Sequence, residues 1–262
     1  MRNARHFGTE PHSTRTRTLS RTGRTLRTVS LPVVLIPGAG GQAWVWHLVE
    51  ADLRRRGYDA FAVDLPAADE SKGLPAYADA VVSAVRDRAV GDRTDGGQAP
   101  VTIAAYSLGA FTAPLICQRV PARQVIFVNA MIPRPGETPG AWWDNVGWEQ
   151  ARTTAARRNG YSPDFDLDTY FLHDIPADLR QQMLGHDVAQ SPGPFGDKCL
   201  FEGWPGIGLH VIAGRDDRFF PVELQQRVAR ERLGVEPDVV PGGHLAALSR
   251  PAELAAALAR YL

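Results

Sequence analysis

The sequence predicts an α/β protein with a mostly parallel sheet, flanking helices and a helical segment inserted between two late strands. Short apolar runs alternate with segments of helical period, a pattern typical of βαβ units. Clusters of glycine and proline directly follow two of these runs, at 37–41 and 241–243. Between about 131 and 205 the strand pattern disappears, and proline, glycine and tryptophan become frequent. A chain of 262 residues is long enough for one such domain with a substantial core.

The first expected strand is the apolar run 33–36, which stops at Pro37. A helix over 46–56 follows, and Gly57 ends it in the position where glycine is favoured. The remaining strands are expected at 60–63, 101–105, 125–128, 209–213 and 238–240. The remaining helices are expected at 76–90, from 107 onward, at 222–233 and at 252–261, with a polar loop at 91–100.

The domain organisation follows from where the strand pattern is interrupted. In an open α/β sheet, segments that follow the carboxyl ends of strands lie over the ligand crevice. We therefore interpret 131–205 as a helical cap, and 29–130 together with 206–262 as the core domain. Residues 1–28 form a separate tail, rich in arginine and threonine, that is too polar to fold by itself.

Composition and charge exclude several classes of function. Hydrophobic residues make up 44% and charged residues 22%, and the formal net charge is zero. The tail has seven of the 29 basic residues and one of the 29 acidic residues, so the rest of the chain is mildly acidic. We therefore expect no nucleic-acid partner, and we interpret the tail as a non-folding extension rather than a nucleic-acid or membrane-binding segment.

The sequence also points to a cytoplasmic protein without a metal centre. No apolar run approaches the ~18 residues of a membrane-spanning helix, and no secretory signal pattern is visible. Cys117 and Cys199 do not form a disulfide framework, and no Cys/His spacing predicts a zinc site.

The segment 105–109, Ala-Tyr-Ser-Leu-Gly, has the features of a nucleophile elbow. It follows a buried strand and precedes a helix, and small residues, Ala105 and Gly109, stand two positions on either side of Ser107. A sharp strand-to-helix turn lifts such a serine above the sheet and directs the next backbone N–H, that of Leu108, toward a developing oxyanion. The alternative is that Ser107 only caps a helix.

A second oxyanion donor is expected in the glycine-rich loop after the first strand. Gly38 to Gly41 allow the backbone to approach a substrate closely, and by position the N–H of Ala39 is the best candidate. A phosphate-binding loop is the alternative, but neither Gly-Lys-Ser/Thr nor G-x-G-x-x-G is present.

The acid and the base of a catalytic triad are expected in loops after the last two strands. Asp216 and Asp217 both follow strand 209–213, and spacing from Gly214 favours Asp217. His244 follows two glycines after strand 238–240, so the chain order is Ser, Asp, His. Alternatively, both aspartates are solvated or paired with neighbouring arginines. The six other histidines lie in the tail, the expected cap or structural positions: His6, His12, His47, His173, His186 and His210.

Together these motifs resemble the α/β-hydrolase superfamily over about 31–262. Segments 38–47, 63–66 and 171–174 are similar to a narrower group of plant methylesterases, hydroxynitrile lyases and bacterial esterases. The resemblance implies the α/β-hydrolase fold, the triad of Ser107, Asp217 and His244, and the oxyanion donors named above. Pro37 replaces the histidine usual before the oxyanion loop. Leu245 stands where the lyases have lysine, and Gly38 where they have threonine, which argues against lyase activity.

The resulting hypothesis is a serine hydrolase that cleaves a carboxylic ester of a small to medium apolar substrate, without a metal or organic cofactor. Thioesters, lactones or a carbon–carbon bond are alternative substrates, and a non-catalytic ligand-binding protein on the same fold is a third possibility. The expected cap aromatics line the pocket or pack the cap's own core. The residues expected to bind substrate are Gly38, Met131, Trp142, Trp143, Tyr170, Phe171 and His173.

Overall fold

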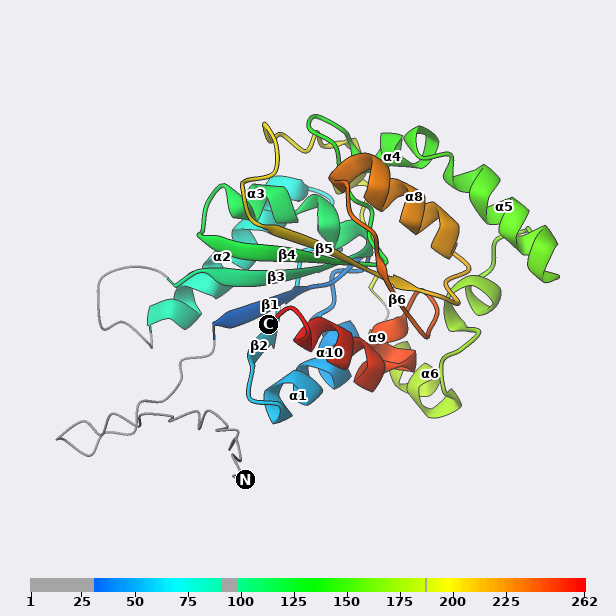
Figure 1. The fold of residues 1–262 in the computed structure, drawn as a ribbon, viewed down its shortest axis with the longest axis horizontal. Coiled ribbons are helices and arrows are strands. Elements are labelled where there is room, and N and C mark those ends of the chain that lie inside the picture. The colour runs from blue at the N-terminus through cyan, green and yellow to red at the C-terminus, as the bar shows by residue number, and fades with distance from the viewer. Residues whose placement is uncertain (1–30, 91–98, 187) are drawn as a thin grey trace, which may run out of the picture.

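The computed structural model describes residues 31–90, 99–186 and 188–262. A single six-stranded sheet runs through this part of the chain in the order β2-β1-β3-β4-β5-β6, and every neighbouring pair is parallel. Figure 1 shows helices on both faces of the sheet. The expected α/β fold is therefore confirmed, whereas the tail 1–28 and most of the expected polar loop 91–100 lie outside the described residues.

The strands are short, and the central ones are apolar throughout. β3 (Val101–Tyr106) is buried at all six positions, because helices cover both of its faces. In β1, Val33 and Leu35 join one core cluster while Val34 and Ile36 join the other, as the two-residue period of a strand requires. The bounds of the strands are β1 Pro32–Ile36, β2 Asp59–Ala62, β4 Ala122–Val128, β5 Gly208–Gly214 and β6 Asp238–Val240.

The helices divide between the two faces. One core cluster contains residues of α1, α9 and α10, and the other contains residues of α2, α3 and α8 (Figure 1). The first three helices span His47–Arg55, Ala246–Ser249 and Pro251–Ala259, and the second three span Leu74–Val90, Ala113–Cys117 and Val222–Leu233. A short 3-10 helix, η1 (Ala43–Trp46), leads into α1.

Local chemistry explains where the structure departs from the expected elements. The helix expected from residue 107 is a 3-10 turn, η2 (Ser107–Phe111), followed by the short α3. Pro114 within the first turn of α3 has no backbone N–H to donate, so it fits the start of a helix and not the interior of a longer one. The four-residue α9 was not expected, because a single turn has no periodicity to detect.

The segment between β4 and β5, which we call the insertion (residues 131–205), is helical where the structure describes it. No strand occurs in 131–186 or 188–205. Its helices are α4 (Pro139–Asn145), α5 (Trp148–Asn159), the π-type η3 (Asp168–Leu172), α6 (Ala177–Met183), η4 (Leu184–His186) and α7 (Gly193–Gly196). That the insertion is a separate cap with these boundaries stays a prediction.

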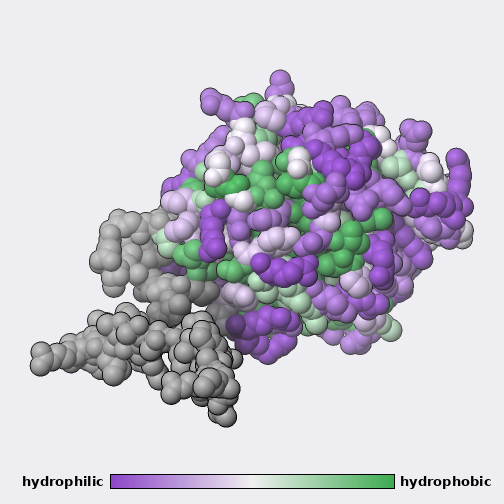
Figure 2. All heavy atoms as spheres, in the orientation of Figure 1, coloured by the Kyte–Doolittle hydropathy of each residue, from purple (hydrophilic) through white to green (hydrophobic). Residues whose placement is uncertain are grey.

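Most of the visible surface in Figure 2 is hydrophilic, with hydrophobic residues between the polar ones. Both cysteines are free. No described helix is long and apolar enough to cross a membrane, and the cytoplasmic location stays a prediction. The large apolar side chains that are exposed include Phe165, Leu167, Leu184 and Leu200, all in the insertion.

A buried ion pair joins the start of the insertion to α8. The side chains of Glu137 and Arg232 are only 4% and 2% exposed, and their groups form a two-armed contact. Glu137 also accepts from the side chain of Asn145 at 2.8 Å and the backbone N–H of Arg134 at 3.1 Å. Burial raises the pKa of Glu137, but the hydrogen bonds from Arg232 and Asn145 outweigh it and hold the pKa below its usual 4.5.

Replacing Glu137 by Gln is expected to lower the free energy of unfolding by about 3 kcal/mol at neutral pH, because a buried guanidinium loses its counter-ion. A carboxylate with a lowered pKa stabilises the fold fully above its unfolded pKa and loses that effect as the pH falls through the folded value. The difference between wild type and Glu137→Gln in urea denaturation should therefore shrink below pH 4.5.

The matched control is Glu223→Gln, which breaks an ion pair to Arg158 whose side chains are 54% and 56% exposed. That change should cost less than about 1 kcal/mol. Equal losses in the two variants would show that the buried pair has no special role in holding the insertion.

Candidate active site

The turn after β3 holds Ser107 in a conformation that few residues adopt. Ser107 has a φ of +49°, and among the described residues only Asn129 shares this property without being glycine. Such left-handed geometry costs roughly 1–2 kcal/mol for an L-residue, so the surrounding packing must enforce it. A Cβ atom on Gly109 would lie 2.2 Å from the carbonyl oxygen of Pro37. The close approach of these two segments explains why a glycine follows the serine by two positions.

Ser107, His244 and Asp217 form a continuous hydrogen-bonded chain. The Ser107 Oγ and His244 Nε2 atoms are 3.1 Å apart, and His244 Nδ1 lies 2.8 Å from Asp217 Oδ2. An ionised carboxylate can only accept, so Nδ1 carries the proton and Nε2 is left to accept from the serine hydroxyl. The three residues are 7%, 2% and 4% exposed. The arrangement thus places an imidazole against a hydroxyl, with both groups largely shielded from solvent.

Asp217 is fixed by the turn that follows β5. Its Oδ1 accepts from the backbone N–H groups of Phe219 at 2.9 Å and Phe220 at 2.8 Å. The side chain of Gln225 in α8 donates to Oδ2 at 3.3 Å. The neighbouring Asp216 is partly exposed and pairs with Arg215 instead. The structure therefore brings Asp217, the residue that the spacing favoured, to the imidazole.

The loop before His244 is attached to the ends of the central strands. Asn129, directly after β4, donates from Nδ2 to the carbonyl oxygens of Gly243 and His244, both at 3.1 Å. Its Oδ1 accepts from the N–H of Gly214 at 2.7 Å. The hydroxyl of Tyr106 donates to the same His244 carbonyl. Asn129 is fully buried, so this network is enclosed.

Sequence reasoning missed Asn129 and Tyr106. The available signal was an asparagine at the carboxyl end of an apolar strand, at the same sheet edge as Ser107. Asparagine also tolerates the left-handed backbone, and Asn129 has a φ of +43°.

The insertion contacts the same loop from its other side. Asp174 Oδ2 accepts from the N–H of Gly243 at 2.7 Å. His173 lies against Gly243, where its Cε1 would be 2.7 Å from an added Cβ. Both ring nitrogens of His173 are buried without a partner among the described residues. Burial, followed by the charge of Arg218, lowers the pKa of His173, which favours the neutral imidazole.

The glycine-rich loop after β1 lies against Ser107. A Cβ atom on Gly38 would be 2.8 Å from Ser107 Cβ. Gly41 donates to the carbonyl of Gly38 at 3.1 Å, and the N–H of Gly40 donates to the side chain of Gln190 in the insertion at 3.1 Å. Ala39 is exposed at the tip of this turn, whereas Leu108 is buried. The roles of Ala39 and Leu108 as oxyanion donors stay a prediction.

Three phenylalanine rings surround the imidazole of His244. The ring centres of Phe171, Phe219 and Phe220 lie 5.0, 5.1 and 4.8 Å from that of His244. Phe171 comes from the insertion, and the other two follow the catalytic-acid candidate. Met131 also contacts the site, because its N–H donates to the Ser107 carbonyl at 3.1 Å. Neither Phe219 nor Phe220 was among the expected substrate-binding residues.

The other expected pocket aromatics lie in packed interior positions. Trp142 is 1% exposed and donates to the carbonyl of Ile132, while Tyr170 is fully buried and donates to the carbonyl of Ser162. Trp143 packs against the rings of Trp142 and Phe219. Trp142 and Trp143 thus pack with the core cluster that includes the central strands rather than in a core of the insertion's own. A substrate contact for them stays a prediction.

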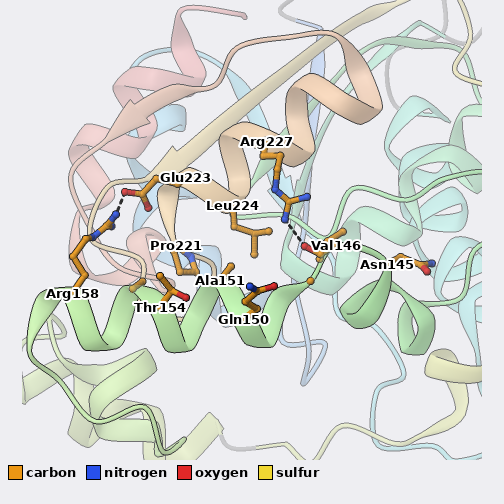
Figure 3. A pocket seen from close by; sticks show the side chains of 12 residues that line it. Asn145, Val146, Gln150, Ala151, Thr154, Arg158, Pro221, Glu223, Leu224 and Arg227 are labelled. Atoms are coloured by element: carbon orange, nitrogen blue, oxygen red, sulfur yellow. Dashed lines mark hydrogen bonds and ion pairs between the residues drawn. The ribbon is translucent and has the colours of Figure 1, made fainter.

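Ser107 lines neither of two cavities at the boundary of the insertion. One, of about 530 Å³, lies between α5 and α8, where Gln150 and Thr154 face Leu224 (Figure 3). The other, of about 480 Å³, is lined in part by His173 and Asp217 and lies beside the acid. Among the residues that the structure describes, no cluster of three or more His, Cys, Asp or Glu side chains could hold a metal ion.

The fold and this site define an α/β hydrolase. The model of the alpha/beta hydrolase family matches residues 33–257, and the chain belongs to this family. It is similar to the probable esterase PIR7A of Oryza sativa, with 25% identity over 87% of this chain and 95% of that protein. It is also similar to methyl jasmonate esterase 1 of Vitis vinifera, with 29% identity over 86% of this chain and 94% of that protein.

Solved structures show the same fold. An extracellular α/β-hydrolase from a Paenibacillus species superposes with a TM-score of 0.67 at 16% identity, covering 88% of this chain and 98% of that one. A pyrethroid hydrolase from Sphingobium faniae gives 0.64 at 20% identity, covering 88% of this chain and 97% of that one. The two plant relatives confirm the resemblance to the plant methylesterase group that the motifs indicated.

Replacing Gly109 by Ala is expected to destabilise the protein by about 1–3 kcal/mol, because the new methyl group collides with the Pro37 carbonyl. Thermal unfolding followed by circular dichroism measures the effect. Gly206→Ala is the control, since a Cβ atom there meets nothing within 4 Å. A Gly109→Ala variant as stable as this control would show that the turn can relax away from the loop after β1.

Proposed function

We propose that this protein is a serine esterase in which Ser107 is the nucleophile, His244 the general base and Asp217 the orienting acid. The observation that carries the proposal is the hydrogen-bonded chain from hydroxyl to imidazole to carboxylate. The strained turn that presents Ser107 at the carboxyl edge of the sheet supports it further.

In the first half of the reaction, Ser107 Oγ attacks the ester carbonyl carbon while its proton moves to His244 Nε2. The carboxylate of Asp217 stabilises the imidazolium that results. The backbone N–H groups of Ala39 and Leu108 would bind the negative oxygen of the tetrahedral intermediate. The intermediate then collapses, His244 returns the proton to the departing alcohol, and an acyl-enzyme remains.

In the second half, a water molecule gives its proton to His244 and attacks the acyl carbonyl. Collapse of this second intermediate releases the carboxylic acid, and Ser107 recovers its proton from the imidazolium. His244 thus carries the serine proton in the first half and the water proton in the second. This chemistry requires no metal or organic cofactor.

We propose an apolar ester of small to medium size as the substrate. The rings of Phe171, Phe219 and Phe220 give the base an apolar surrounding. The relatives named as esterases, including the one named for methyl jasmonate, agree with an ester substrate. Because Ser107 and His244 are nearly buried, the insertion would act as a cap that moves to admit substrate.

The decisive experiment is covalent labelling with a fluorophosphonate probe, followed by a panel of p-nitrophenyl esters, acyl thioesters and lactones. Ser107→Ala should abolish labelling and reduce ester turnover by about 10⁴-fold or more. Turnover that survives this substitution would overturn the mechanism. A wild type that labels but prefers thioesters or lactones would correct the substrate class and leave the mechanism intact.

Asp217→Asn should reduce kcat by roughly 10⁴-fold, because an amide no longer holds the imidazole in the tautomer that accepts from serine. Asp238→Asn is the control, since this carboxylate at the start of β6 pairs with Arg260 at 2.7 Å, at the opposite end of the strands from the imidazole. It should retain kcat to within about threefold. Comparable losses in the two variants would contradict the assignment of the acid.

A further inference from the structure

We infer that Asp174, a residue of the insertion, is a positioning residue for the general base, so that His244 is held in place only when this part of the insertion is seated on the core. The inference rests on the proposed function, because it assigns His244 as the base. Under this inference the insertion both covers the site and positions the loop that carries His244.

The loop that carries His244 has little means of fixing its own shape. Gly242 has a φ of +118°, and glycines at 242 and 243 give the chain wide conformational freedom. His244 lies outside both β6 and α9, so no regular element fixes it. The orientation of the imidazole therefore depends on what holds the peptide groups beside it.

Side chains hold these peptide groups from opposite sides. Asn129 and Tyr106 bind the carbonyl side of the loop from the ends of β4 and β3. The N–H of Gly242 donates to Asp216 at 3.1 Å, and the N–H of Gly243 donates to Asp174 at 2.7 Å. Three of the four supports belong to the core. Asp174 is the support that the insertion provides.

The contact between Asp174 and the loop is tight. A Cβ atom on Gly243 would lie 2.8 Å from Asp174 Oδ1 and 2.7 Å from His173 Cε1, so only glycine fits beneath this segment. The next residue, Ile175, is 5% exposed and packs in a cluster with Leu248 of α9, the helix that follows the base. The insertion thus contacts the chain both just before His244, at Gly243, and just after it, at Leu248.

Asp174 is a half-buried residue whose two carboxyl oxygens differ in their surroundings. Its Oδ1 atom is buried and has no partner among the described residues, and burial of a polar atom without a partner is costly. The bond to Gly243 has the short length typical of a charge-assisted hydrogen bond. Asp174 also lines the cavity of about 480 Å³ beside Asp217, together with the cationic side chains of Arg218 and Arg250. The one hydrogen bond that Asp174 accepts within the described part of the chain therefore goes to the residue before the base.

Loss of this acceptor should affect the reaction rate more than substrate binding. The N–H of Gly243 would be left without its partner, and the loop would be held from the core side alone. Displacement of a reacting group by about 1 Å can reduce a rate by about 10²-fold. We expect Asp174→Ala to lower kcat by about 10- to 100-fold, with KM within about threefold of wild type.

The test compares four proteins: wild type, Asp174→Ala, Asp174→Asn and Asp178→Ala. Asp174→Asn keeps an oxygen that accepts from Gly243 but removes the charge, so it should recover at least a third of the wild-type kcat. Asp178 is an exposed carboxylate four residues further along the insertion, and its loss should leave kcat unchanged. A Tm within a few degrees of wild type establishes that each variant folds.

Three results would overturn the inference. The first is a kcat for Asp174→Ala within threefold of wild type. The second is a rise in KM alone, which would indicate a substrate contact. The third is an equal loss in Asp174→Asn and Asp174→Ala, which would indicate a role for the charge rather than the hydrogen bond. If Asp174→Ala does not fold, the isosteric Asp174→Asn with a kcat below a tenth of wild type overturns it as well.

A spectroscopic measurement separates this inference from the proposed function. The proton between His244 Nδ1 and Asp217 should give a low-field NMR signal, which is assigned by its loss in Asp217→Ala. This signal should broaden or shift in Asp174→Ala and remain unchanged in Asp178→Ala, whether or not an ester is turned over. An unchanged signal in Asp174→Ala overturns the inference. Ester turnover that survives Ser107→Ala overturns only the proposed function.

Discussion

The site depends on the adjacency of three parallel strands, β3, β4 and β5. Because they run in the same direction, the residues that follow them meet at one edge of the sheet: Ser107 after β3, Asn129 after β4 and Asp217 after β5. Asn129, after the middle strand, bonds both to Gly214 at the end of β5 and to the loop that carries His244. The apolar strands thus determine where the polar groups converge, although none of the three polar residues lies within a strand.

Much of this arrangement could be predicted, because its determinants are local in the sequence. A buried strand, a tight turn with small residues and a helix-forming segment identify Ser107 without knowledge of distant contacts. The same reasoning selected Asp217 and His244, since each follows a strand and glycines precede the histidine, and the structure brings both side chains into one hydrogen-bonded chain with Ser107. Strand β6 and helix α8 occur at the predicted residues, because two β-branched valines favour a strand in the first segment and the second has helical period.

The supports of the triad could not be predicted, because each is a contact between segments far apart in the chain. Asn129 and the carbonyl of His244 are separated by 115 positions, and Asp174 and Gly243 by 69. Asparagine after a strand or aspartate in a loop is common, and nothing local distinguishes a residue that binds a catalytic loop. The same holds for Phe219 and Phe220, whose sequence neighbourhood indicates a turn but not an aromatic surrounding for the base.

A buried triad creates a conflict that the insertion helps to resolve. Excluding water strengthens the electrostatic interactions among the three groups. A base on a glycine-rich loop, however, keeps a fixed position only if neighbouring residues hold that loop. Contacts from the core alone would leave the site open and the N–H of Gly243 without its acceptor. A cover without polar contacts would close the site but leave the loop held from the core side only. The hydrogen bond from Gly243 to Asp174 serves both exclusion of water and positioning of the loop, because the segment that lies over His244 also accepts from the peptide group beside it. Under the proposed mechanism, closure of the site and alignment of the base would therefore be linked through the peptide group of Gly243.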